Sequence, residues 1–318
     1  MVHPRDFIRT SHQTFAAFLV LGGVFLRAVQ DALAKLTSSE LSLWQFQFFR
    51  GFFNILLLIL FFRIFFGKHI PWPRRVWAVA LRSLFLVSSM GFFYAGIPYL
   101  GLAEVSAGLY VFPLFVVILS YVVLGERVGL HRSAAIFVGF VGTLLVLKPG
   151  TTIFAPVALL PVGAGFFYAC TLLTTRKLCR DESPITLVFG AALTCLIMGA
   201  IGLIYLSNQA LEVDSIDWPY LFTGWRTAEL WMYGVIALYS ALNLISNVSL
   251  AKAYQSAESS WLVPFHYSYI IFATLWGFII WRHMPDLLTF LGILLIAGSG
   301  MFVALQQQGE TGGRNTVS

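Results

Sequence analysis

Ten apolar runs, each of a length suited to crossing a lipid bilayer, limit this chain to very few folds. A bilayer core about 30 Å thick is crossed by about 20 residues of α-helix. Because lipid offers the backbone no hydrogen-bond partners, an open chain in it must be helical. The sequence therefore predicts an all-α membrane protein with ten transmembrane helices, at 16–35, 43–66, 76–99, 104–124, 133–148, 155–175, 185–206, 231–254, 259–281 and 286–305.

The composition agrees with a membrane protein. Charged residues make up 11% of the 318 residues and hydrophobic residues 58%, whereas about 25% of residues are charged in soluble proteins. The three cysteines, Cys170, Cys179 and Cys195, lack CxxC spacing, so neither a disulfide framework nor a metal site is expected. The motifs of ATP-binding loops and zinc peptidases are absent from the sequence, and we expect no cofactor.

The polar segments define the ends of the membrane domain. Residues 1–15 are polar, and the first apolar run has no small-residue cleavage site, which indicates a first span and not a signal peptide. The only long connection, 207–230, is acidic and is interpreted as a surface loop. The polar tail, 306–318, is expected to be disordered.

The basic residues predict the orientation. An N-terminus in the cytoplasm places thirteen Lys and Arg residues on the cytoplasmic side and four on the other side. This bias indicates a multi-pass protein of the cytoplasmic (inner) membrane with both termini in the cytoplasm. It also accounts for most of the net charge of +6, so nucleic acid is not expected as a partner.

The two halves of the chain show a weak internal repeat. A shift of 142 residues aligns Lys35 with Lys177 and Glu40 with Glu182, and a shift of 158 aligns Gly142 with Gly300. The units are 16–150 and 151–305, with five spans each. Because five is odd, the two units must have opposite orientations in the membrane. Inverted repeats of this kind are used by secondary transporters to build a site at the bilayer midplane.

Two segments carry a resemblance to a known family. The run FYAGIPYLGLAEVSAGLYVFPLFVVILSYVVLGERV, followed by GFVGTLLVLKPG, resembles the EamA-like family of the drug/metabolite transporter superfamily. The resemblance covers all ten runs. It implies a bundle of two inverted five-helix repeats, a central cavity, and transport of small organic metabolites without ATP. The chain departs from the family at Arg282-His283, where a second Gly-Glu is usual.

Ionisable residues inside the apolar runs are the first candidates for a site, because a charge at bilayer depth is costly and is usually paired. Arg27 and Asp31 are four residues apart and share one helix face. Arg50 lies at a similar depth on the next run, so Asp31 could pair with either arginine. One hypothesis places all three in the outward half of a cavity, where an arginine binds a substrate carboxylate and Asp31 carries a proton. The alternative is a charge network that holds the first two helices together.

The remaining candidates each have a structural alternative. Arg82 lies near the cytoplasmic side, where it binds substrate or extends to the membrane surface. Asn243 and Asn247 share a helix face, which also suits hydrogen bonds between helices. The other candidates for a cavity wall or gate lie beside prolines or face the sixth span: Tyr110, Tyr168, His266 and Tyr267.

The function favoured by the sequence is secondary transport, by alternating access, of a small organic metabolite. The arginines favour a substrate with a carboxylate, such as an amino acid or a related compound. The alternatives are a non-transporting membrane receptor or scaffold and an intramembrane enzyme. The enzyme is disfavoured because we find neither a nucleophile nor a metal cluster. Faces of small residues, including Gly139, Gly142 and Gly292, are expected to form either a homodimer contact or packing within one chain. Membrane lipid surrounds the bundle in each case.

Overall fold

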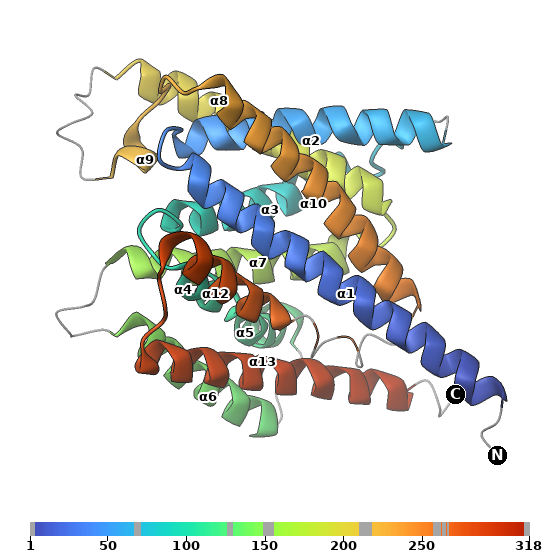
Figure 1. Cartoon of the computed structure of the whole chain (residues 1–318). Helices are drawn as coiled ribbons and strands as arrows, with labels where there is room; N and C mark the ends of the chain where they lie inside the picture. The colour runs from blue at the N-terminus through green and yellow to red at the C-terminus, as the bar shows by residue number, and fades with distance from the viewer. Residues whose placement is uncertain are drawn as a thin grey trace.

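A computed structural model describes residues 4–66, 71–125, 130–148, 156–209, 218–256, 262, 265 and 267–314. Every regular element in these ranges is a helix (Figure 1). The elements are α1 (Pro4–Thr37), α2 (Leu43–Phe66), α3 (Val76–Gly96), α4 (Leu102–Leu109), α5 (Phe112–Leu124), α6 (Leu130–Leu147), the 3-10 turn η1 (Pro156–Ala158), α7 (Leu159–Leu178), α8 (Pro184–Ser207), α9 (Pro219–Phe222), α10 (Leu230–Ser256), α12 (Ser268–Trp281) and α13 (Leu287–Arg314).

The helices have the length and composition of membrane spans. Seven stretches within the described residues are long and apolar enough to cross a bilayer, and three shorter apolar helices cover Phe137–Leu147, Ser268–Trp281 and Leu287–Phe302. The prediction of an all-helical membrane protein is therefore confirmed.

The fourth apolar run is broken in its middle. Pro113 lies in the first turn of α5, where its missing N–H leaves no hydrogen bond unmade. The chain therefore turns between α4 and α5, and Val111 donates to the carbonyl of Gly108 as in a 3-10 turn. This break places Tyr110 at a bend instead of within a straight helix.

Three of the described helices end in the left-handed backbone conformation, and one of them is α6, which is followed by Lys148 with φ 50°. Gly125 follows α5 with φ 67°, and Arg282 follows α12 with φ 56°. The left-handed region is cheap for glycine and costly for other residues. The departure noted at Arg282 thus keeps the geometry of the helix end, although the residue that favours this geometry is missing.

The two halves of the chain interlock. The most extensive helix contacts are α1 with α10, α2 with α8, α3 with α7, and α6 with α13, and each pair joins a helix of the first half to one of the second (Figure 1). On α6 and α13 the small residues meet each other, because a Cβ added at Gly292 would lie 2.6 Å from the carbonyl oxygen of Gly142. The small residues of α6 and α13 therefore pack against each other within one chain.

The chain ends lie together. The start of α1 and the end of α13 are at the same end of the bundle (Figure 1). Helix α13 continues to Arg314, and the expected disorder of the tail, 306–318, stays a prediction.

Candidate functional site

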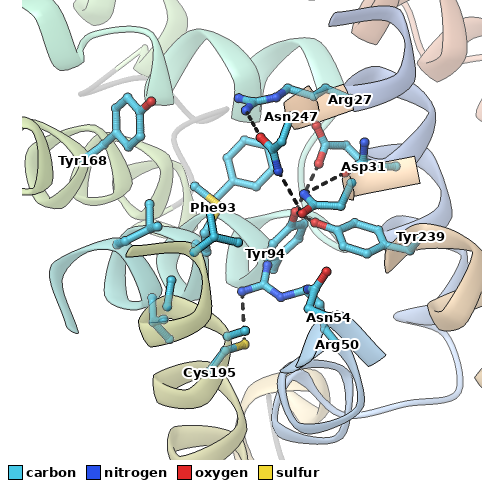
Figure 2. A pocket seen from close by; sticks show the side chains of 18 of the residues that line it. Arg27, Asp31, Arg50, Asn54, Phe93, Tyr94, Tyr168, Cys195, Tyr239 and Asn247 are labelled. Atoms are coloured by element: carbon cyan, nitrogen blue, oxygen red, sulfur yellow. Dashed lines mark hydrogen bonds between the residues drawn. The ribbon is translucent and has the colours of Figure 1, made fainter. Parts of the chain in front are cut away.

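A cavity of about 290 Å³ lies between the two halves of the chain. Its wall is formed by α1, α2, α3, the α4–α5 bend, α7, α8, α10 and α12 (Figure 2). The residues predicted from the sequence that line it are Arg27, Asp31, Arg50, Arg82, Tyr110, Tyr168 and Asn243. Tyr267 is not part of this lining, and His266 lies outside the described residues.

Asp31 is bound by tyrosines. Its side chain is 7% exposed. Its carboxylate accepts a hydrogen bond from the hydroxyl of Tyr269 and another, at 3.3 Å, from that of Tyr94. The Tyr94 hydroxyl also lies 2.6 Å from that of Tyr239. In the described part of the chain, neither Arg27 nor Arg50 forms an ion pair with this carboxylate, so the pairing that we considered from the sequence is not found.

Arg27 begins a chain of amide hydrogen bonds between α1 and α10. Its Nη2 donates to Oδ1 of Asn247 at 3.0 Å, and Nδ2 of Asn247 donates to Oδ1 of Asn243 at 3.0 Å. Nδ2 of Asn243 then donates to Oε1 of Gln30 at 3.2 Å. The asparagines therefore connect helices, as the structural alternative expected, and also line the cavity.

Arg50 is buried against sulfur and aromatic rings. It is 6% exposed, and its Nη2 donates to Sγ of Cys195 at 3.2 Å. Its guanidinium lies over the rings of Tyr94 and Phe46, at 5.1 and 5.8 Å from their centroids. Stacking of this kind attracts a cation to the negative face of the ring. Figure 2 shows the guanidinium between Tyr94 and Cys195.

Arg82 is held by the second half of the chain. Its Nε donates to Oγ1 of Thr175 on α7, and its Nη1 donates to the carbonyl of Leu187 on α8, both at 3.2 Å. The guanidinium is therefore directed at neighbouring helices while its side chain lines the cavity.

Tyrosines form an aromatic wall at the α4–α5 bend. Tyr110 stacks on Tyr269 with centroids 5.4 Å apart and an interplanar angle of 17°. Tyr267 lies 5.4 Å from Tyr110 at 55°, so it supports the wall from behind without lining the cavity. The ring of Tyr168 meets that of Phe112 edge to face at 4.9 Å.

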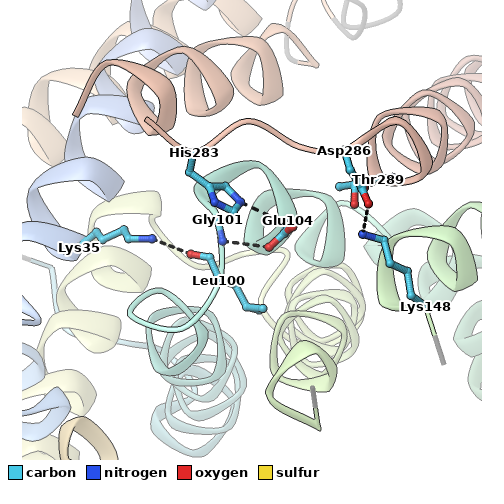
Figure 3. A network of polar contacts seen from close by, with 8 residues as sticks. All are labelled: Lys35, Leu100, Gly101, Glu104, Lys148, His283, Asp286 and Thr289. Atoms are coloured by element: carbon cyan, nitrogen blue, oxygen red, sulfur yellow. Dashed lines mark hydrogen bonds and ion pairs between the residues drawn. The ribbon is translucent and has the colours of Figure 1, made fainter. Parts of the chain in front are cut away.

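A second polar group, which we call the Lys35 cluster, lies where α1 and α12 end and α4 and α13 begin (Figure 3). Nζ of Lys35 donates to the carbonyl of Leu100 at 2.7 Å and lies 5.1 Å from the centroid of Trp281. The other two contacts of the cluster are those between His283 and Glu104, at 3.7 Å, and between Lys148 and Asp286, at 2.6 Å. The hydrogen bond from Lys148 lowers the pKa of Asp286 to about 2.

Sequence comparisons agree with this architecture. The profile of the EamA-like transporter family matches residues 14–148 and 155–305. A solved crystal structure with 18% sequence identity superposes with a TM-score of 0.57 and covers 95% of this chain and 99% of its own, which supports the fold.

Characterised relatives carry different small molecules. The S-adenosylmethionine uptake transporter of Rickettsia prowazekii is 21% identical over 281 residues, covering 88% of this chain and 89% of the relative. The riboflavin transporter of Vibrio cholerae is 31% identical over 191 residues, covering 60% and 58%. The pseudopaline exporter CntI of Pseudomonas aeruginosa is 25% identical over 279 residues, covering 86% and 89%. With two copies of the family profile across a helical bundle of membrane-spanning character, this chain is an integral, multi-pass membrane protein that belongs to the EamA-like transporter family.

Proposed function

We propose that this protein is a secondary transporter that moves a small, carboxylate-bearing organic metabolite across the inner membrane by alternating access. The observation that carries the proposal is the cavity between the two halves, whose described lining contains three guanidinium groups and one carboxyl group. Buried ionisable groups in membrane proteins mark substrate and ion pathways. The excess of positive charge favours an anionic substrate.

The size of the cavity supports a small substrate. Ligand pockets usually enclose about 300–1,000 Å³, and this cavity, at about 290 Å³, is at the lower limit of that range. Tyr110 and Tyr168 add aromatic surface to the charged lining, which suits a compound with both a polar group and an apolar body. The named relatives, which handle S-adenosylmethionine, riboflavin and pseudopaline, also act on small organic molecules.

The helix contacts support two repeats related by a two-fold axis. If α1, α2 and α3 correspond to α7, α8 and α10, exchanging the halves converts the α1–α10 contact into the α7–α3 contact and leaves α2–α8 unchanged. All of these contacts are among the most extensive in the bundle. A set of helix contacts that is unchanged when the halves are exchanged is expected for inverted repeats in a transporter.

Two acidic side chains support the same correspondence. Glu182 accepts hydrogen bonds from the backbone N–H groups of Arg74 and Arg75 just before α3, at 3.1 and 2.7 Å. Glu40, which aligns with Glu182, lies 3.4 Å from the backbone nitrogen of Glu229 just before α10. Carboxylates stabilise helix N-termini. The two helices that would be exchanged by the axis are thus capped by the two glutamates that would be exchanged.

A total of ten membrane crossings agrees with the positions of the first and last helices. Seven long and three shorter apolar helices are available, and an even number of crossings returns the chain to its starting side. The start of α1 and the end of α13 lie at one end of the bundle (Figure 1). The distribution of basic residues then favours a cytoplasmic position for both termini.

The proposal is tested with purified protein in two steps. A thermal-shift screen against amino acids, vitamins, nucleosides and organic acids identifies ligands, since a ligand at 100 times its Kd stabilises the native state by about 2.7 kcal/mol. Ligands that stabilise the protein are then offered to proteoliposomes. We expect saturable uptake that protein-free liposomes lack. Binding without flux would instead favour a non-transporting membrane receptor.

A further inference from the structure

The three arginines that line the cavity differ in what holds their guanidinium groups. Arg27 donates to the amide oxygen of Asn247, and Arg82 donates to a threonine hydroxyl and a backbone carbonyl. These oxygens are good acceptors, and each bond joins helices from the two halves of the chain. Arg27 and Arg82 therefore have partners suited to a role in positioning helices.

Arg50 also bonds across the two halves, but to a thiol and a phenol. The Sγ atom of Cys195, to which it donates, itself donates to the carbonyl of Gln47 at 3.1 Å. A thiol sulfur is a weak acceptor, whereas a guanidinium has five N–H donors. Arg50 also donates to the hydroxyl of Tyr239, and its guanidinium lies over the rings of Phe46 and Tyr94. All of these groups are uncharged.

Charge neutralisation of Arg50 within the protein is also incomplete, because Asp31 interacts electrostatically with both Arg27 and Arg50 and forms an ion pair with neither in the described residues. Among the described residues that line the cavity, Asp31 is the only acid, and its carboxylate accepts hydrogen bonds from Tyr94 and Tyr269. No carboxylate in the described ranges forms an ion pair with Arg50, although that side chain is only 6% exposed. A buried charge without a counter-ion is costly and is retained where a ligand supplies the opposite charge.

We propose that Arg50 is the anion subsite of the cavity and binds a carboxylate of the substrate through two parallel N–H···O bonds. The planar guanidinium matches a carboxylate in this fork geometry, and both bonds are strengthened by charge. The rings of Phe46 and Tyr94 hold the plane of the guanidinium in place. This inference rests on the proposed transport function and deepens it, because it selects one of three arginines as the one that contacts substrate.

The test compares acids with their uncharged amides on the full-length protein in detergent. The probe pairs are benzoate and benzamide, and nicotinate and nicotinamide, with affinity measured by thermal shift. We expect at least one acid to bind more tightly than its amide. Arg50→Gln should weaken binding of that acid about 10- to 100-fold and leave the amide nearly unchanged, as expected for loss of a charged hydrogen bond. Arg50→Lys keeps the charge without the fork, and should be intermediate.

A matched control is available on the same helix. Arg63 is exposed in the last turn of α2 and does not line the cavity, so Arg63→Gln should keep the wild-type preference for the acid. The ratio of acid to amide affinity separates binding from folding, because a damaged protein loses both ligands together. The proposal is overturned if no acid binds more tightly than its amide. It is also overturned if Arg27→Gln or Arg82→Gln removes the preference while Arg50→Gln keeps it.

Failure of this subsite and failure of the transport function are distinguishable. Acid binding that depends on Arg50, without saturable flux in proteoliposomes, would support the subsite and contradict the transporter. Saturable flux of an acid that is unchanged in Arg50→Gln would support the transporter and contradict the subsite.

Discussion

Replacing the carboxyl group of Asp31 by an amide tests whether this residue carries the coupling proton. Asn at this position keeps the size of the side chain and an oxygen that can accept from Tyr94 or Tyr269, but it cannot carry a proton. If Asp31 carries the coupling proton, Asp31→Asn abolishes accumulation driven by a pH gradient and leaves exchange of substrate across the membrane intact. Both are measured in proteoliposomes with labelled substrate.

The control for this variant is Asp181→Asn, which removes an exposed carboxylate that does not line the cavity. It should retain accumulation driven by the pH gradient. If Asp31→Asn also retains it, Asp31 has no part in coupling.

Arg282 is predicted to lower the stability of the helix end at which it lies. A left-handed conformation costs a non-glycine residue about 1–2 kcal/mol, and Arg282 adopts it with φ 56°. Replacement by glycine removes this cost, less about 1 kcal/mol for the greater freedom of glycine in the unfolded chain. Arg282→Gly is therefore expected to raise the midpoint of thermal unfolding in detergent by a small amount.

The reverse substitution is the control for this prediction. Gly125 has φ 67°, and a Cβ added there would meet no atom within 4 Å. Gly125→Ala thus isolates the backbone conformation from packing and should lower the unfolding midpoint. A lower midpoint for Arg282→Gly would instead mean that stacking of Arg282 on Phe278, at 5.6 Å, outweighs the backbone cost.

The charged residues of the cavity can be predicted from the sequence, but the tyrosines that bind them cannot. Arg27, Asp31 and Arg50 stand out because few charges occur inside apolar runs. Tyr94 and Tyr239 do not stand out, because tyrosines are common in membrane spans and the sequence does not show which hydroxyl has a hydrogen-bond partner. Whether Asp31 is bound by arginines or by tyrosines depends on how helices from both halves meet, which periodicity within one helix cannot show.

The length of an apolar run predicts where a helix such as α2 lies, but it does not predict where a run is interrupted. The sequence predicts the second run at 43–66, which matches α2 at Leu43–Phe66. The sequence predicts one continuous fourth run, yet the structure divides it into α4 and α5. Length and hydropathy are the same for a straight span and for one that bends at a proline, so the break at Tyr110 depends on packing around Pro113.

The contact between α6 and α13 predicts opposite effects for two glycines on the same helix. A Cβ at Gly292 would lie 2.6 Å from the carbonyl oxygen of Gly142 and 2.7 Å from a methyl of Val146. Gly292→Ala should therefore destabilise the protein by about 1–3 kcal/mol through overpacking. Gly298 is exposed with no atom within 4 Å of such a Cβ, so Gly298→Ala should stabilise the helix by up to about 1 kcal/mol.

Both variants are measured by thermal unfolding in the same detergent. The matched pair controls for the effect of glycine on the unfolded chain, which is the same at both positions. Equal shifts for the two variants would show that α6 and α13 do not approach as closely as their glycines indicate.

The bundle as a whole was predictable to the extent that its two halves share a pattern. The alignment of Glu40 with Glu182 comes from the sequence, and the structure adds that Glu182 contacts the residues just before α3 and Glu40 the residue just before α10. The pairing of α1 with α10 and of α3 with α7 could not be predicted, because all spans are apolar and lipid is as apolar as their side chains. The orientation of the repeats in the membrane stays a prediction.

Alternating access requires the halves to separate at one end of the bundle while they remain joined at the other. The Lys35 cluster joins them, since Lys35 and Glu104 belong to the first half and Trp281 and His283 to the second. In the proposed topology this end faces outward. Lys35→Met removes the cation–π contact that Lys35 makes with Trp281 in the other half, which is worth about 0.5–2 kcal/mol. The equilibrium should therefore shift several-fold toward the state that is open outward.

The shift can be measured as accessibility of the cavity from outside the cell. Met90 lines the cavity, so a Met90→Cys substitution in a cysteine-free background reports access of a membrane-impermeant maleimide. Lys35→Met should raise the labelling rate several-fold. Lys177 aligns with Lys35 but lies exposed in the last turn of α7, and Lys177→Met should leave the rate unchanged because this lysine makes no equivalent contact among the described residues. Unchanged labelling in Lys35→Met would mean that contacts other than the Lys35 cluster hold the outer end closed.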